Sequence, residues 1–327
     1  MSQIDDRLDR LFTMEFARVT EQTAIAAARF CGRGDEEAAD KAASAAMFDG
    51  LSSLAMNGTI VIGEYEDAPM LAVGSKIGTG EGPEFDIAVD PLEGATLCVK
   101  DLPNALVSMA VAQKGGLLHA PGMYMEKIAI GGEYDAAIVN IEATPRENIE
   151  ALAKARNVSP QDITVCILDR SRHARLIEDV RNTGAAIRLI GDGDIAGVIA
   201  TASWEQTGID IYMGVGGAPE GVLAAAALRC VGGQMQGRLV IRNQGDAALA
   251  RSMGIEDTAR VYDLEDLAHG DLFFAASGIT DGSMFEGVRF DNHWIETDTI
   301  VMRSRTGTVR RINTRHVNPR NAAHESP

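Results

Sequence analysis

Acidic residues stand at positions from which distant carboxylates could reach one site. Glu64 follows the short β-branched run at 59–62 after a single glycine, and Asp90 follows the run at 86–89. Both side chains would therefore leave the carboxyl ends of strands, where open α/β sheets place their ligands. Glu93 comes three residues after Asp90, close enough for the two carboxylates to serve the same site.

Two further residues complete the candidate cluster: Asp40, within a helical pattern, and Glu220, which begins a helix after the glycine-rich run at 214–217. Five carboxylates in one cavity would repel one another strongly unless cations neutralised them. Oxygen donors favour the hard cations Mg²⁺ or Mn²⁺ over zinc. Such ions can hold a phosphate ester and lower the pKa of a bound water that attacks phosphorus. The pattern thus indicates metal-assisted phosphate chemistry, although an isolated Asp or Glu is usually a solvated surface group.

The elements that must position these residues follow from periodicity. Apolar residues recur at helical spacing from about Asp6 to Cys31 and again from Glu36 to Met56. Short apolar or β-branched runs predict strands at 59–62, 86–89, 105–112, 127–130, 163–168, 186–190, 210–215 and 238–241, with more after Leu272. Helical patterns fall between the later strands at 147–156, 173–181, 195–202 and 220–230. This alternation predicts a layered α/β fold.

A weak domain boundary is expected near residues 143–148, where Thr144-Pro145 precedes a new helix. We therefore predict two closely associated lobes, residues 1–145 and residues 146–327.

Composition limits the classes of partner. The chain of 327 residues has a formal net charge of −17, which disfavours nucleic acid and anionic membranes because both are polyanions. The N-terminus shows no secretory signal, and no apolar run reaches the ~18 residues of a membrane helix, so a cytoplasmic protein is expected. The cysteines are widely spaced and form no C-x-x-C pair, which predicts buried, reduced thiols; they are Cys31, Cys98, Cys166 and Cys230.

Longer motifs follow one another in order between about Phe16 and Arg311. They are Gly32-Arg33-Gly34-Asp35 with Ala38-Ala39-Asp40, Ile60-Val61-Ile62-Gly63-Glu64, Ala68-Pro69-Met70-Leu71, Asp86-Ile87-Ala88-Val89-Asp90-Pro91-Leu92-Glu93-Gly94, and Gly216-Gly217-Ala218-Pro219-Glu220-Gly221. Together they resemble the class II (GlpX-type) fructose-1,6-bisphosphatases of the lithium-sensitive phosphatase superfamily. The resemblance implies an α-β-α-β-α sandwich of the sugar-phosphatase type, Mn²⁺ or Mg²⁺ as cofactor, and a homodimer or homotetramer. It also implies hydrolysis of the 1-phosphate of fructose 1,6-bisphosphate in gluconeogenesis.

The same resemblance implies roles for individual residues. The metal ligands would be Asp40, Glu64, Asp90, Glu93 and Glu220, and the catalytic positions Asp90, Glu93, Glu64 and Thr96. The substrate contacts would be Glu93, Gly94, Ala95, Tyr124, Arg170, Arg172, His173, Asp192, Gly193, Asp194 and Gly217, most of them in the second lobe. Guanidinium groups suit a sugar phosphate because their donors form a planar fork. Without the resemblance, the Asp-Gly-Asp segment would be an ordinary turn.

Two departures from the family pattern fall near the expected reaction centre. The family's Glu-Gly-Thr is here Glu93-Gly94-Ala95, followed by Thr96. In the family that threonine hydroxyl helps to orient the attacking water, and a methyl group cannot replace it. Glu36-Glu37 stands where family members often carry a lysine.

Three interpretations therefore remain open at this stage. They are a fructose-1,6-bisphosphatase, a sedoheptulose-1,7-bisphosphatase or dual-specificity enzyme, and a catalytically weak paralogue that binds sugar phosphate.

Overall fold

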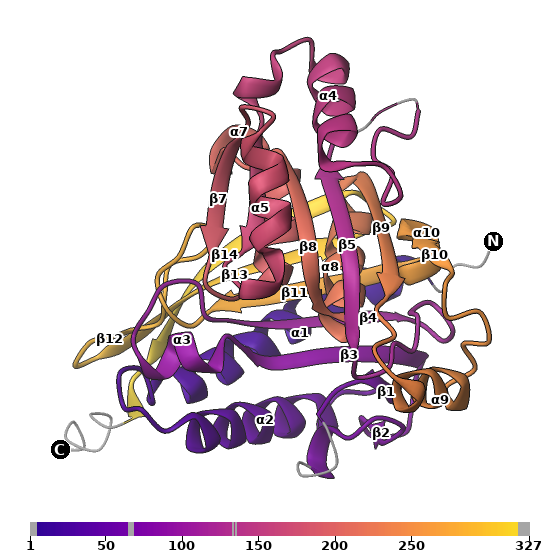
Figure 1. Ribbon diagram of the computed structural model, residues 1–327. Helices are drawn as coiled ribbons and strands as arrows, with labels where there is room; N and C mark the ends of the chain where they lie inside the picture. The colour runs from indigo at the N-terminus through magenta and orange to yellow at the C-terminus, as the bar shows by residue number, and fades with distance from the viewer. Residues whose placement is uncertain (1–4, 65–68, 133, 135, 320–327) are drawn as a thin grey trace, which may run out of the picture. The chain divides into compact units, whose positions relative to one another are not determined.

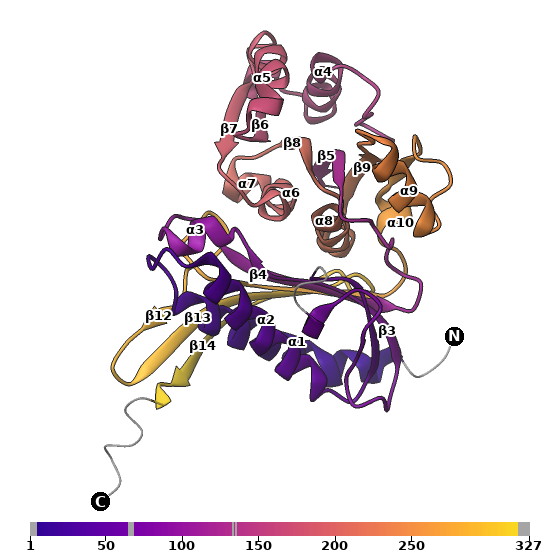
Figure 2. The same ribbon diagram turned by 60° about the horizontal axis from the view of Figure 1, so that its bottom comes forward.

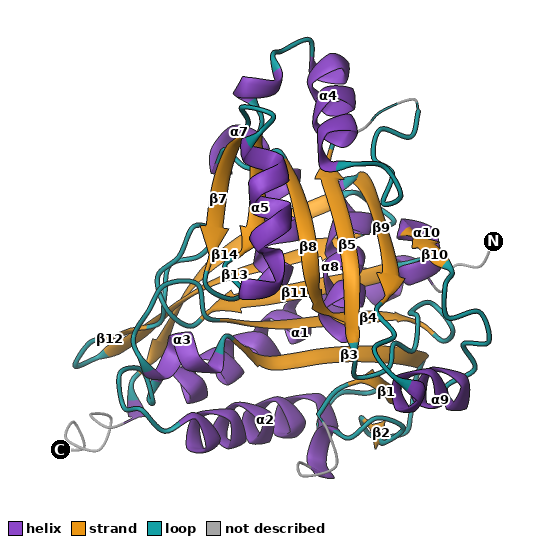
Figure 3. Cartoon of the chain, viewed as in Figure 1, coloured by secondary structure: helices purple, strands orange, loops and turns teal. Residues whose placement is uncertain are grey.

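The computed structural model describes residues 5–64, 69–132, 134 and 136–319. Its internal contacts divide the chain into two units, each with its own sheet (Figures 1 and 3). Unit 1 comprises Met1–Val111, Phe273–Arg303 and Val309–Pro327, and unit 2 comprises Ala112–Leu272 and Ser304–Thr308.

This division differs from the predicted boundary after residue 145. The Thr144-Pro145 signal marks a helix start instead, because Thr144 and Glu147 form a capping box at the beginning of α4 (Pro145–Arg156). The C-terminal strands return to the sheet of unit 1 by pairing with distant segments, and a local sequence pattern does not reveal such a return.

Helices α1 and α2 lie together along one face of the unit 1 sheet (Figure 2). The elements of this unit are α1 (Asp5–Ala28), α2 (Glu36–Ser52), β1 (Asn57–Ile62), a 3₁₀ turn (Pro69–Leu71), β2 (Lys76–Ile77), β3 (Glu84–Glu93), α3 (Ala95–Val99), β4 (Leu106–Gln113), β11 (Leu272–Gly278), β12 (Arg289–Phe290), β13 (Trp294–Arg303) and β14 (Thr308–Val317). The strand order is β12-β13-β11-β4-β3-β1-β2, and β14 pairs with β13. Phe16 of α1 fixes the helix on the sheet, because its ring meets Phe273 of β11 edge-on at 5.4 Å.

Helix α2 owes its position to one buried stripe. Ala39, Ala43, Met47 and Leu51 are fully buried, and their spacing of four residues places them on one helical face. The side chain of Asp35 caps the helix by accepting a hydrogen bond from the Ala38 N–H at 3.0 Å. Asp40 directly follows the first residue of this stripe, so its carboxylate is held at the edge of the core in a half-buried position.

The sheet of unit 2 has helices on both faces: α4 and α5 on one, α6 and α8 on the other (Figure 2). Its strand order is β10-β9-β5-β8-β6-β7. Besides α4, the unit contains β5 (Tyr124–Gly131), β6 (Thr164–Leu168), α5 (Ala174–Arg181), β7 (Ala186–Ile190), α6 (Asp194–Ala202), α7 (Trp204–Thr207), β8 (Ile211–Gly217), α8 (Ala218–Val231), β9 (Gly233–Leu239), α9 (Gln244–Ser252), β10 (Val261–Asp263), α10 (Leu264–Leu267) and 3₁₀ turns at Pro160–Asp162 and Ser171–His173. Strands β6, β7 and β8 run parallel, whereas β5 is antiparallel to both β8 and β9.

The predicted α/β class is confirmed, and most predicted elements lie close to their expected places. The largest differences in boundaries are three. The second helix ends at Ser52, β3 extends through Asp90 to Glu93, and β9 begins at Gly233. The last difference arises because full pairing with β5, from Met125 opposite Leu239 to Gly131 opposite Gly233, overrides the weak strand preference of Gly and Gln. Within the described part of the chain, no helix is both long and apolar enough to cross a membrane.

Candidate functional site

Parallel pairing of β1 with β3 brings two of the predicted carboxylates to neighbouring chain positions in unit 1. In the register of β1 and β3, Ile62 lies opposite Ala88. Glu64 stands two residues beyond this matched pair, just past the end of β1, whereas Asp90, also two residues beyond it, lies within the C-terminal part of β3. The predicted position after a strand therefore holds for Glu64, whereas Asp90 lies three residues before the end of its strand because β3 is longer than expected.

Glu64 and Asp40 are close enough to influence each other's charge. Ser44, one turn along α2 from Asp40, donates a hydrogen bond to Oε1 of Glu64 at 3.4 Å. Burial, with added repulsion from Asp40, raises the pKa of Glu64 to about 7, and burial also raises the pKa of Asp40. A bound divalent cation would relieve this repulsion and favour both ionised forms, so the donor set fits a hard cation.

Asp90 and Glu93 occupy the end of β3. Asp90 Oδ1 accepts the Leu92 N–H at 3.2 Å, which orients the half-buried carboxylate, and Glu93 is buried. Gly94 then turns the chain into α3 with a φ of +80°, a conformation that favours glycine. The segment 93–95 thus has a defined backbone path directly after the carboxylates.

The two departures from the family pattern meet in the structure. Thr96 Oγ1 donates a hydrogen bond to Oε1 of Glu36 at 2.9 Å, while Ala95 packs against the core of unit 1. The hydroxyl of Thr96, next to Ala95, is thus already hydrogen-bonded to Glu36, which stands near the position where family members often carry a lysine.

Unit 2 contains a buried lysine whose role the sequence left open. Lys127 on β5 is 2% exposed, pairs with the Asp194 carboxylate and donates to the Gly217 carbonyl at 2.8 Å. The pair therefore joins the predicted 192–194 loop to the end of β8. The sequence signal for a buried ion pair was a charged residue inside an apolar strand pattern, because lysine is rarely buried without a partner.

Glu220 lies beside this ion pair. A Cβ on Gly217 would come within 1.8 Å of Oε2 of Glu220, so only glycine leaves room for the carboxylate. Burial raises the pKa of Glu220, repulsion from Asp194 adds to the shift, and Lys127 opposes it. The structure thus brings Glu220 together with the 192–194 loop within unit 2.

Two guanidinium groups lie over the ring of Tyr124. The Cζ atoms of Arg172 and Arg242 are 4.9 Å and 5.1 Å from the ring centroid. Arg172 is anchored by two hydrogen bonds to the Val215 carbonyl, at 2.9 and 2.7 Å, and Arg242 by one to Asp246 at 3.1 Å. Such a cluster suits a phosphate group.

Sequence reasoning missed Arg242, since nothing local connects it with Tyr124. The two are brought together by the pairing of β5 with β9, which places Met125 opposite Leu239, and by the bond from the Val240 N–H to the Tyr124 carbonyl at 2.8 Å. Only the register of the folded sheet contains this information.

Arg170 and His173, both predicted substrate contacts, are held by the protein itself. Arg170 pairs with Asp192 at 3.5 Å and donates to the carbonyl of Gly191. His173 is 2% exposed; its Nε2 accepts the Val215 N–H at 2.8 Å, so its Nδ1 donates to the Leu168 carbonyl at 2.7 Å. Burial lowers the pKa of His173, which agrees with a neutral ring. We therefore assign His173 a positioning role between β6 and β8.

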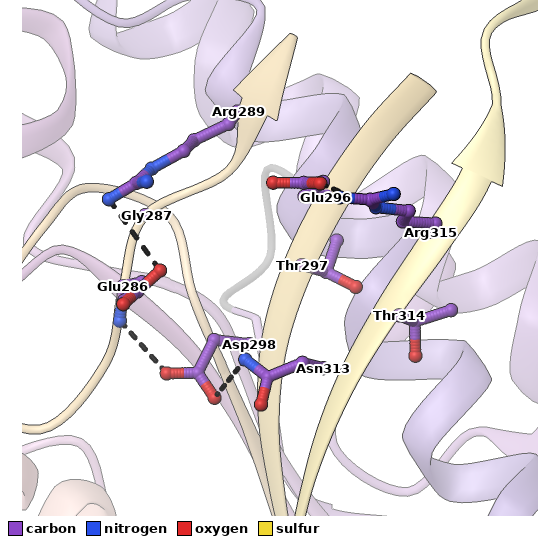
Figure 4. Close-up of a pocket in the computed structure, with 9 residues that line it drawn as sticks. All are labelled: Glu286, Gly287, Arg289, Glu296, Thr297, Asp298, Asn313, Thr314 and Arg315. Atoms are coloured by element: carbon purple, nitrogen blue, oxygen red, sulfur yellow. Dashed lines mark hydrogen bonds and ion pairs between the residues drawn. The ribbon is translucent and has the colours of Figure 1, made fainter. Parts of the chain in front are cut away.

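A cavity of about 500 Å³ in unit 1 contains none of the predicted residues (Figure 4). Its charged groups are paired with one another: Arg315 with Glu296 at 2.7 Å, and Arg289 with Glu286 at 3.5 Å. The buried Asp298 accepts the Glu286 N–H at 2.9 Å. These contacts join the strands β12, β13 and β14, so the charged residues around the cavity have a structural role.

Each unit brings only part of the predicted metal set together. Asp40 meets Glu64 in unit 1, and Glu220 meets the Lys127 pair in unit 2. No group of three or more Asp, Glu, His or Cys side chains that could hold a metal ion occurs among residues 5–64, 69–132, 134 and 136–319. The meeting of all five carboxylates remains a prediction.

The two units define an α/β protein with carboxylates around the paired strands β1 and β3 in one and arginines around a tyrosine in the other. A family model described as "Bacterial fructose-1,6-bisphosphatase, glpX-encoded" matches residues 10–316, so the chain belongs to this family. Two relatives named "D-fructose 1,6-bisphosphatase class 2/sedoheptulose 1,7-bisphosphatase" are each 40% identical to it. The Prochlorococcus marinus (strain NATL1A) protein aligns over 326 residues, 95% of this chain and 97% of its own. The Synechococcus sp. (strain JA-3-3Ab) protein aligns over 337 residues, 95% and 96% respectively.

The raised pKa of Glu64 predicts a pH-dependent stability in the absence of metal. Because the folded pKa of about 7 exceeds the ordinary 4.5, the folded state binds the proton more tightly, and this contribution is lost as pH rises from about 4.5 through 7. Glu64→Gln should remove this loss. Between pH 5 and pH 8, the free energy of unfolding of the metal-free variant should therefore rise by about 1–2 kcal/mol relative to that of the wild type, after allowance for solvent screening. Urea denaturation in EDTA measures this. Exposed Glu37→Gln is the control, and identical pH profiles for Glu64→Gln and wild type would contradict the assignment.

Proposed function

We propose that this protein hydrolyses the 1-phosphate of fructose 1,6-bisphosphate, giving fructose 6-phosphate and phosphate, and that it also accepts sedoheptulose 1,7-bisphosphate. The observation that carries the proposal is the pairing of β1 with β3 in a member of the fructose-bisphosphatase family, with Glu64 just past β1 and Asp90 in the C-terminal part of β3. The second substrate is suggested by the names of the relatives, which include both bisphosphatase activities.

The oxygen donors of the carboxylates and the raised pKa of Glu64 support Mn²⁺ or Mg²⁺ as the cofactor. The proposed ligands are Asp40, Glu64, Asp90, Glu93 and Glu220. When bound, such a cation supplies charge neutralisation of the phosphate and a lower pKa for a coordinated water.

The chain's own residues would bind and orient the sugar bisphosphate. Arg172 and Arg242, stacked on Tyr124, would hold the phosphate that is not cleaved, because their donors can approach it from two sides. The Asp192-Gly193-Asp194 loop would bind sugar hydroxyls through Asp192, while Lys127 keeps Asp194 in place. The 93–95 segment would contact the substrate next to the catalytic carboxylates.

The same proposal includes a cytoplasmic homo-oligomer, a dimer or a tetramer, that works in gluconeogenesis and glycerol metabolism. Its support is the family membership, together with the acidic composition, which suits a small-molecule substrate better than a polyanionic partner.

Removal of the Asp90 carboxylate tests the activity. With Mn²⁺ or Mg²⁺, the wild type should release phosphate from both sugar bisphosphates, and Asp90→Asn should lower kcat by about 10³-fold or more because it removes a charge at the reaction centre. Phosphate release, compared as kcat/KM for the two substrates, is the measurement. Asp49→Asn, on an exposed position of α2, is the matched control. Undiminished turnover in EDTA would refute the metal-dependent mechanism.

Arg242 offers a test of the phosphate-binding cluster. Arg242→Gln should raise KM for fructose 1,6-bisphosphate by about 10- to 100-fold with little change in kcat, since a charge-assisted hydrogen bond is worth about 1.5–3 kcal/mol. Steady-state kinetics with the bisphosphate measure the change. Arg251→Gln, on an exposed position of the neighbouring α9, should leave KM unchanged. Equal KM values for Arg242→Gln and wild type would exclude the residue from the site.

The weak-catalysis alternative depends on the missing hydroxyl at position 95. Since Glu36 already engages the Thr96 hydroxyl, Ala95→Thr should raise kcat by about tenfold or more at constant KM by supplying a group that orients water. Ala95→Val, which has nearly the same shape without the hydroxyl, separates packing from hydrogen bonding. An equal gain with valine would contradict this explanation, and a wild type without turnover that Ala95→Thr restores would favour the weak paralogue.

A further inference from the structure

Two cysteines that are far apart in the sequence lie side by side within unit 1. The Sγ atoms of Cys31 and Cys98 are 3.6 Å apart, although 67 positions separate the residues. A disulfide bond has an S–S length of about 2.05 Å, so a small change of side-chain torsion and backbone would join the two sulfurs. Sequence spacing had predicted four unconnected, buried thiols.

The backbone around the two thiols is already fastened together. The Gly32 N–H donates to the Cys98 carbonyl at 3.2 Å, and the Gly34 N–H donates to the Val99 carbonyl at 3.0 Å. These bonds hold the turn after α1 against the last residues of α3. The approach of the sulfurs is therefore a property of the fold and not of one side-chain rotamer.

The two thiols differ in a way that suits stepwise oxidation. Cys31 is half-buried and open to small molecules, whereas Cys98 is fully buried and can act only after Cys31 has reacted. The contact between the two thiols lowers the pKa of Cys31 and raises that of Cys98. Cys31 is therefore the better nucleophile of the pair.

The other two cysteines have no such setting. Cys166 and Cys230 are both buried, and burial raises the pKa of Cys166 to about 12. They serve as internal controls for accessibility.

We propose that Cys31 and Cys98 form a reversible disulfide that controls the geometry around the segment after Glu93. The oxidant is a small-molecule disulfide. The Cys31 thiolate attacks one sulfur of this small molecule. A mixed disulfide between Cys31 and half of the small molecule forms, and the other half leaves as a thiolate. The Cys98 sulfur then attacks Cys31 Sγ, its proton passes to the second departing thiolate, and the protein disulfide results. Two protein thiols are oxidised and one small disulfide is reduced to two thiols.

Both partners lead directly into the predicted site. Cys98 belongs to α3, which begins two residues after Glu93, and the turn that follows Cys31 runs into α2, which carries Asp40. Thr96 on α3 also donates a hydrogen bond to Glu36 at the start of α2. The sulfurs must close from 3.6 Å to about 2.05 Å, and a displacement of about 1 Å at a reacting group can cost about 10²-fold in rate. Whichever element moves, the change reaches residues next to the carboxylates.

The experiment oxidises the full-length protein with glutathione disulfide under native conditions and follows two readouts. Peptide mapping by mass spectrometry should find a Cys31–Cys98 cross-link that dithiothreitol removes, with Cys166 and Cys230 still as thiols. Fructose-bisphosphatase activity, a readout that rests on the proposed function, should fall about tenfold or more and recover on reduction.

Cys31→Ser tests the cause, because this half-buried position tolerates a polar side chain better than Cys98. The variant should retain its activity in glutathione disulfide, and Cys230→Ser should behave like the wild type. Absence of the cross-link in folded wild type would overturn the proposal. A cross-link with unchanged turnover would overturn the regulatory part. If the protein has no phosphatase activity at all, the proposed function fails, and the cross-link still decides whether the thiol pair is real.

Discussion

The parallel pairing of β1 with β3 is the interaction on which the candidate chemistry depends. A one-residue slip of β3 would turn Asp90 to the opposite face of the sheet, since side chains alternate along a strand. The register is held by the buried side chains of both strands, including the fully buried Ile60 and Ile87, which lie opposite each other. Apolar packing thus fixes the position of the chain segments that carry the acidic side chains of Glu64 and Asp90.

The two units handle their buried charge in different ways. In unit 1, burial raises the pKa of Glu64, and repulsion from Asp40 adds to the shift. In unit 2, the carboxylate of Asp194 is neutralised by a cation that the chain itself supplies, Lys127. A site that must admit a metal or a phosphate needs unbalanced charge, whereas a loop that must stay in place needs balanced charge. The structure contains both arrangements.

The thiol pair connects the candidate site with the surface of unit 1. Helix α3 is short and begins immediately after the carboxylates of β3, so anything that ties down its last turn also affects its first. The hydrogen bonds from Gly32 and Gly34 to Cys98 and Val99 already couple it to the turn after α1. A covalent bond at the same place would strengthen an existing contact and would require no new one.

The sequence by itself determined the α/β class, most helices and strands and the family motifs, and it supplied the prediction of the carboxylates. These follow from local periodicity, turn residues and short motifs, which a linear chain displays directly. Tertiary structure alone decided the division into units, the extent of β9, the burial of Lys127, the place of Arg242 over Tyr124 and the meeting of Cys31 with Cys98. Each of these depends on strand register or on contacts between segments far apart in the chain, and no local pattern encodes such distances.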